Sequence, residues 1–229
     1  MWYFRRRMMW WVLLLIGCSM PNTLVQAEMY VAGQVGVTLP QSLSNVEVSD
    51  PSIGLPSGST FSNLDLQNSV MYGAKLGYYF ESLKWLGVET EVFNTTPHVK
   101  QQPITVTVPG SPSFTINPAG SYLRVLTWAP INLVVRYQMG KFEPYAGVGM
   151  GLFFSRLKDA GSNDSTSSTS VGLNTQVGLR YRVTNNVALF GEWKFNHARL
   201  GFDATPNAFT NADATYNAHH LVFGVGYHF

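Results

Sequence analysis

Nine charged side chains are the residues of this sequence whose types and spacing could do chemistry. They lie in stretches where apolar and polar residues alternate, and they all fall on the polar parity of those stretches. Because alternate residues of a β-strand share one face, we expect the nine to line a single surface. Six bases and three acids on one surface could pair with one another or could give a narrow pore a preference for anions. The set is Lys75, Glu89, Glu91, Arg124, Arg136, Arg180, Arg182, Glu192 and Lys194.

Eight alternating stretches must position these charges. The segments between them are in turn long and short, with long segments at 40–67, 96–120, 156–169 and about 198–217. Pro130 cannot donate a ladder hydrogen bond, so we predict a local bulge there. Residues 104–116 could form an extra hairpin or prolong a strand, and the sequence leaves both open. The stretches are 29–39, 68–80, 86–95, 122–138, 144–155, 170–183, 187–196 and 221–229.

The alternation alone does not say which face points inward. The apolar parity carries no charge, whereas the charged parity is rich in glycine, as a narrow polar lumen requires. Aromatic residues also gather at the strand ends next to the short turns, where they suit a membrane interface. These features favour a transmembrane barrel over a lipocalin-like soluble barrel. The aromatic residues are Tyr78, Phe80, Trp85, Tyr137, Tyr145, Tyr181, Tyr227 and Phe229.

The sequence therefore predicts an all-β fold: a single antiparallel up-and-down transmembrane β-barrel of about eight strands, over residues 28–229. Only 12% of the residues are charged, against about a quarter in typical soluble domains. No apolar run reaches the roughly 20 residues that a membrane-spanning helix needs. Short periplasmic turns and long outer loops indicate the outer membrane of a Gram-negative-type bacterium.

Residues 1–27 have the three parts of a secretory signal peptide. Arg5, Arg6 and Arg7 precede an apolar run, and a small residue, Ala27, ends the segment. Cleavage after Ala27 would leave 12 basic and 13 acidic residues, a net charge of −1, which argues against a nucleic-acid partner. An alternative is a lipidated N-terminus at Cys18, the only cysteine. With cleavage after Ala27 no disulfide can form.

Two segments carry a resemblance to a family. Residues 129–151, APINLVVRYQMGKFEPYAGVGMG, resemble the central hairpin of small eight-stranded outer-membrane barrels. That group includes the outer-membrane protein A transmembrane domain, the adhesin/invasin-type barrels and the opacity-protein porin-like group. Residues 189–195, LFGEWKF, are similar to its penultimate strand. The resemblance implies adhesion, surface interaction or a role in envelope integrity.

The chain end resembles the signal read by the barrel-assembly machinery. Gly224 stands at its glycine position, and Tyr227 and Phe229 are its aromatic residues. Val222 departs from the pattern, which usually has a polar residue there. The resemblance implies two partners, outer-membrane lipid and the assembly machinery, and we expect a monomer.

Enzymatic chemistry is the other class to weigh. The segment FNHARLG, residues 195–201, resembles the His-x-Ser region of lipid A deacylases, but Arg199 stands where the nucleophilic serine should be. The histidines form no metal-ligand cluster, and we expect neither a metal nor a cofactor.

We therefore predict a non-enzymatic barrel whose lumen charges pair into a plug and whose long loops could bind a surface ligand. We expect exposed apolar tips on these loops, such as Ile53, Leu55 and Phe209. A small channel is the alternative, and a lipid A-modifying enzyme is a weaker one.

Overall fold

The computed structural model describes residues 28–50, 55–118, 120–159, 165–203 and 211–229. The predicted signal peptide and Cys18 lie outside these residues. Within the described ranges, no helix has both the length and the apolar character needed to cross a membrane.

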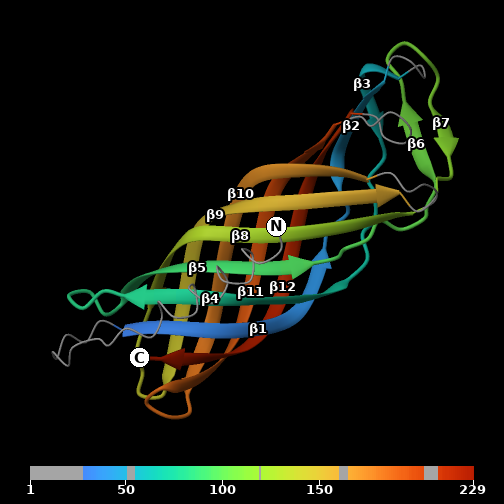
Figure 1. Ribbon diagram of the computed structural model, residues 1–229. Coiled ribbons are helices and arrows are strands. Elements are labelled where there is room, and N and C mark those ends of the chain that lie inside the picture. Colours follow the sequence, from blue (N-terminus) through green and yellow to red (C-terminus); the bar gives the residue numbers. More distant parts are fainter. Residues whose placement is uncertain (1–27, 51–54, 119, 160–164, 204–210) are drawn as a thin grey trace, which may run out of the picture.

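Eight antiparallel strands close into a barrel, as the alternation predicts (Figure 1). The barrel closes where the first and last strands pair, with Tyr30 opposite His228 and Pro40 opposite Ala218. Closure leaves no open sheet edge for lipid to meet. The strands are β1 (Glu28–Pro40), β4 (Ser69–Tyr79), β5 (Leu86–Thr95), β8 (Ser121–Arg136), β9 (Phe142–Asp159), β10 (Ser165–Arg182), β11 (Val187–Phe202) and β12 (Asn211–His228).

Four further strands form an extension at the end opposite the C-terminus, at the upper right of Figure 1. They are β2 (Ser44–Asp50), β3 (Leu55–Phe61), β6 (Ile104–Thr107) and β7 (Phe114–Ile116). They add to the upper part of β12 in the order β2, β3, β6, β7. Residues 104–116 are therefore a hairpin, the first of the two alternatives that the sequence left open. Since long outer segments mark the extracellular side of such barrels, we take this end as extracellular.

The prediction of four long loops was wrong in extent. Strand β9 continues to Asp159 and β10 begins at Ser165, so most of the segment predicted as a loop at 156–169 is a paired hairpin. Strands β11 and β12 likewise cover much of 198–217. Residues 165–169 are all serine or threonine, and outward positions above the membrane can be polar because they face water.

Strand β11 shows how the chain meets lipid and water on the same face. Its outward residues are apolar up to Trp193 and Phe195, and the next two outward residues are His197 and Arg199. The outward face of β9 changes in the same way, from Phe154 to Arg156. We place the upper edge of the lipid-facing belt at this change, because a charged side chain in contact with hydrocarbon is costly.

The inward face of β11 changes in the opposite direction. In the membrane it carries Glu192, Lys194 and Asn196, and above the belt it carries Ala198 and Leu200, all of them buried. The extension thus encloses an apolar core above a polar lumen. Sixteen described residues form this extension core: Leu43, Val46, Val48, Leu55, Leu66, Val106, Val108, Leu123, Val125, Phe153, Ala198, Leu200, Phe202, Ala214, Tyr216 and Ala218.

Strand β8 contains the predicted bulge at Pro130. Its pairing with β9 shifts register between Trp128 and Ile131. Below the bulge Ile131, Leu133 and Val135 face outward, as the alternation predicts.

Above the bulge the parity reverses, and four residues expected to face lipid are instead buried inside: Leu123, Val125, Thr127 and Ala129. One extra residue moves every following side chain to the other face of a strand.

Candidate functional site

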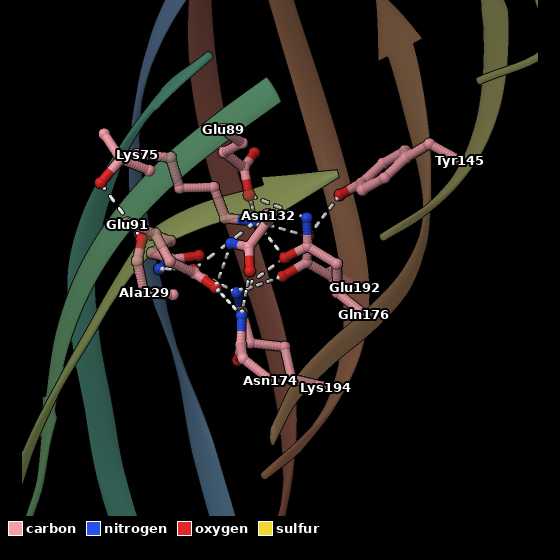
Figure 2. Close-up of polar contacts among 12 residues, drawn as sticks. Lys75, Glu89, Glu91, Ala129, Asn132, Tyr145, Asn174, Gln176, Glu192 and Lys194 are labelled. Carbon is pink, nitrogen blue, oxygen red and sulfur yellow. Dashed lines mark hydrogen bonds and ion pairs between the residues drawn. The ribbon is translucent and has the colours of Figure 1, made fainter. Parts of the chain in front are cut away.

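Two lysines and three glutamates form a charge network in the middle of the lumen (Figure 2). The Lys194 side chain has no exposed surface, and its Nζ pairs with Glu91 and lies 2.8 Å from Glu192 Oε1. Lys75 Nζ lies 2.6 Å from Glu192 Oε2 and 3.4 Å from Glu89 Oε1. Burying such charges singly would be very costly, so each one is held beside an opposite charge.

Amide side chains add further hydrogen bonds to the network. Gln176 donates to Glu89 over 2.8 Å and accepts from Lys75 over 3.0 Å and from Lys194 over 3.1 Å. Asn174 donates to Glu91 over 2.8 Å. Because Gln176 contacts both lysines, it joins the two halves of the network.

A second cluster closes the lumen towards the short turns. Glu143 pairs with Arg180 at 3.3 Å, with Arg136 at 3.4 Å and with Arg182. Glu28 pairs with Arg136 at 2.6 Å and with Arg182. Three guanidinium groups thus surround two carboxylates, and His228 Nδ1 lies 2.6 Å from Glu28 Oε1.

Tyrosines lie between the two clusters and contact both. The Arg180 guanidinium lies 4.7 Å from the centre of the Tyr30 ring and 5.1 Å from that of Tyr145, within reach of cation–π attraction. Tyr30 donates to Glu89, and Tyr145 donates to Glu192 over 2.8 Å. The tyrosines therefore connect the central network to the lower cluster.

Little space is left in this part of the lumen. A cavity of about 10 Å³ lies between Tyr30, Lys75, Tyr145, Arg180 and Phe190. That volume is about the least that can hold one water molecule. The side chains therefore fill this part of the lumen, which we call the plug.

Eight of the nine predicted charges lie inside the barrel. Arg124 is the exception: it lies on the outer face of β8, exposed, and donates to Asn94 Oδ1 over 2.6 Å. The prediction for Arg124 was wrong because the bulge at Pro130 reverses the parity above it. The eight are Lys75, Glu89, Glu91, Arg136, Arg180, Arg182, Glu192 and Lys194.

Sequence reasoning missed two lumen carboxylates, Glu28 and Glu143. Both stand at the first residues of strands, where alternation has too few residues to define a face. With them the described lumen holds five bases and five acids, so the predicted surplus of positive charge was wrong. The sequence did hold a signal for Glu143: it is two residues before Tyr145, so the two side chains share one face of the strand.

Aromatic residues near the short turns divide between the two faces. Tyr145 was expected at the membrane interface but is buried in the lumen. Tyr227 and Phe229, expected in the assembly signal, face outward with ring centres 5.1 Å apart. Gly224 lies on the lumen side, where a Cβ atom would overlap the Phe190 ring and the Gly33 carbonyl.

The extension core above the plug holds few polar groups. The Tyr216 hydroxyl is buried without a hydrogen-bond partner among the described residues. Burial raises the pKa of Tyr216, because removal from water disfavours the charged phenolate.

His220, at the boundary between the core and the plug, is fully buried. It lies 2.9 Å from Thr38 Oγ1 and 2.8 Å from Asn196 Oδ1. Both ring nitrogens therefore have a hydrogen-bond partner.

Solved structures with a similar fold are outer-membrane barrels. Pseudomonas aeruginosa outer membrane protein OprG matches with a TM-score of 0.57 and 16% identity, covering 89% of this chain and 96% of that one. Neisserial surface protein A matches with a TM-score of 0.54 and 16% identity, covering 87% and 96%. Outer membrane protein AlkL, solved in lipid bilayers, matches with a TM-score of 0.51 and 16% identity, covering 93% and 94%. At this identity the likeness shows the fold.

A search of curated proteins found no match. A family model described as the outer membrane protein beta-barrel domain matches residues 11–229. Together with the closed eight-stranded barrel and its lipid-facing belt, that match places the protein in the outer membrane of a Gram-negative bacterium. The chain belongs to the outer membrane protein beta-barrel domain family.

Proposed function

We propose that this barrel is a non-enzymatic surface protein, in which a plugged lumen anchors an ordered extracellular sheet that binds a surface ligand. The observation that carries the proposal is the extension. The barrel wall continues above the lipid-facing belt as paired strands with their own apolar core, instead of ending in long loops. A rigid scaffold of this kind holds a recognition surface in one conformation.

The plug supports an anchoring role rather than transport. The five described bases and five described acids of the lumen pair with one another across it. An ion crossing the barrel would have to displace these pairs and then pass the extension core. We therefore prefer the anchor to the narrow channel.

The polar groups at the core–plug boundary support a non-enzymatic role. His220, the histidine at this boundary, is fully buried between a threonine and an asparagine, so its ring has no surface open to a substrate. Among the described residues, no three acids, histidines or cysteines lie together in the way that a metal site requires.

The β6–β7 hairpin is the element of the extension best placed for binding. In the described chain β7 pairs only with β6, so its other edge presents unpaired backbone groups to which a partner strand could add. Phe114 on this strand is 48% exposed. Leu55, which the sequence suggested as an exposed loop tip, is instead buried in the extension core. Ile53 and Phe209, the other suggested tips, lie outside the described residues.

Replacing residues 104–116 with a short Gly/Ser linker tests this function. We expect bacteria displaying the trimmed protein to bind immobilised glycans and extracellular-matrix proteins about tenfold less than bacteria displaying the intact protein, because the hot spots of an interface lie in few residues. The measurement is the number of cells retained across the panel.

The matched control is gel mobility of heated and unheated samples, which must show the same folded fraction for both proteins. The β2–β3 hairpin loses the pairing of β3 with β6 but stays attached to the barrel, since β2 pairs with β12. Equal retention of the two strains would refute binding through this hairpin.

A further inference from the structure

Two arginines face each other on the outer surface of the barrel wall. Arg124 of β8 is directly opposite Arg156 of β9, and both side chains are exposed. Lys158, two residues further along β9 and also exposed, is opposite Tyr122. Like charges directly opposite on neighbouring strands are destabilising. We call Arg124, Arg156 and Lys158 the outer basic patch.

No described carboxylate neutralises the outer basic patch. Among the described side chains, none of its three members forms an ion pair, and two of them are held by neutral groups. Arg124 donates to Asn94 Oδ1 over 2.6 Å, and Arg156 donates to Ser165 Oγ over 3.0 Å. Each guanidinium is thus oriented by one hydrogen bond and keeps further N–H groups for another acceptor.

Arg199, another exposed arginine above the lipid-facing belt, has carboxylates as neighbours. Arg199 lies 3.6 Å from Glu47 and 3.7 Å from Asp213. The same outer surface therefore supplies carboxylates to Arg199 but none of the described ones to Arg124 and Arg156. This contrast indicates that the counter-charge of the outer basic patch comes from another molecule.

The depth of the patch identifies the class of that molecule. The Arg124–Arg156 pair is two residues above the Leu126–Phe154 pair and four above Trp128 and Leu152. At about 3.3 Å per residue, the backbone of the two arginines lies roughly 7 Å along the strands from the last apolar pair of the belt. That is the level of lipid headgroups, where phosphate is the anion that a planar guanidinium binds best.

An apolar groove lies below the patch on the same outer face. It has a volume of about 300 Å³ and is lined by Leu76, Tyr78, Val88, Thr90, Pro130 and Ile131, where β8 and β5 are bulged. Because this face lies within the lipid belt, the groove is open to membrane acyl chains. The outer basic patch and the groove therefore lie along the same strand, β8, at positions suited to a lipid headgroup and to its acyl chain.

We propose that the outer basic patch binds the phosphate groups of a phosphorylated glycolipid of the outer leaflet, of the lipid A type. Arg124 and Arg156 share its phosphate, which cancels their repulsion, and Lys158 adds a third positive charge. An acyl chain of the glycolipid descends past Trp128 towards the groove. The bound lipid then stabilises the wall where the extension leaves the membrane.

Titration of the detergent-purified, full-length protein tests the proposal. The probes are bis-phosphorylated lipid A, the same lipid after removal of its phosphates, and inorganic phosphate, and native mass spectrometry measures the bound fraction. We expect the R124Q/R156Q double variant to lose about tenfold in affinity for bis-phosphorylated lipid A, since charge-assisted bonds to phosphate are lost. The matched control R199Q should stay within about twofold, because its charge is already neutralised.

A measurement of thermal stability tests the proposal independently of how tightly the protein binds lipid A. Without glycolipid, R156Q should raise the midpoint of thermal unfolding, because it removes the repulsion between Arg124 and Arg156. With bis-phosphorylated lipid A present, the wild-type midpoint should rise and that of R124Q/R156Q should not.

Three results would overturn the proposal. They are equal binding of lipid A by the double variant and the wild type, equal binding of the phosphate-free lipid, and stabilisation by inorganic phosphate alone that lipid A does not exceed. The last result would assign the patch to a free anion.

Discussion

Replacing Lys194 with methionine should lower the free energy of unfolding by about 3–5 kcal/mol, because it removes one of the two lysines that neutralise the buried carboxylates of Glu91 and Glu192. Lys194 pairs with Glu91 and Glu192, and all three side chains are fully buried. Methionine keeps most of the volume and removes the charge. Denaturant unfolding of the protein in detergent micelles, followed by gel mobility, measures the loss.

Lys141→Met is the matched control, since Lys141 is exposed in a short turn. It should change the unfolding free energy by less than about 0.5 kcal/mol. Adding Glu91→Gln to Lys194→Met should recover about 0.5–3 kcal/mol relative to the sum of the single changes, because the two residues are in contact. A Lys194→Met protein as stable as the wild type would contradict the charge network.

Replacing Phe153 with alanine should lower the free energy of unfolding by about 3–5 kcal/mol. Phe153 has no exposed surface and belongs to the extension core, with its ring against Gly151 and Gly172. Alanine would leave a cavity where the extension joins the plug, and the close-packed wall can fill it only in part. The same unfolding measurement applies, with hydrogen exchange to show that protection is lost first in the extension.

Phe154→Ala is the paired comparison, because Phe154 is the next residue and faces outward with 38% of its surface exposed. It should cost less than half as much as Phe153→Ala, since lipid covers the site that the ring leaves. Equal losses at the two positions would contradict the inward and outward assignment of β9.

Alternation was enough to predict the barrel, because apolar side chains facing lipid and polar side chains facing a lumen give a strict period of two. It also placed Glu192 and Lys194 on one face of β11. Alternation counts residues, however, and a bulge adds one. Pro130 predicted the bulge. The bulge also exchanges the inward and outward faces of every residue of β8 above it, and the prediction for Arg124 did not include this exchange.

Strand ends were the second limit. Glu28 and Glu143 stand where a strand begins, so no run of neighbours defined their face. Each neutralises arginines that come from other strands, and such partners depend on the strand order around the barrel. Tyr145 shares the parity of Gly147 and Gly149, so alternation placed it towards the lumen, and its position near a short turn misassigned it to the membrane interface.

The extension was the third limit. Its strands are rich in serine and threonine, so composition favoured loops at 40–67 and 156–169. Above the membrane the outward face meets water, and the apolar core faces inward, so the alternation that marks a membrane strand is inverted. Residues such as Leu200, which continue the inward face of β11, carried that signal in the sequence.

Single-channel recording in planar lipid bilayers tests the central claim, that the barrel is a plugged anchor. The purified wild-type protein should insert without producing stable ohmic conductance, because the paired lumen charges and the extension core block the path of an ion. Long-lived, large conductance steps from the folded wild-type protein would contradict the plug and with it the proposed anchoring role.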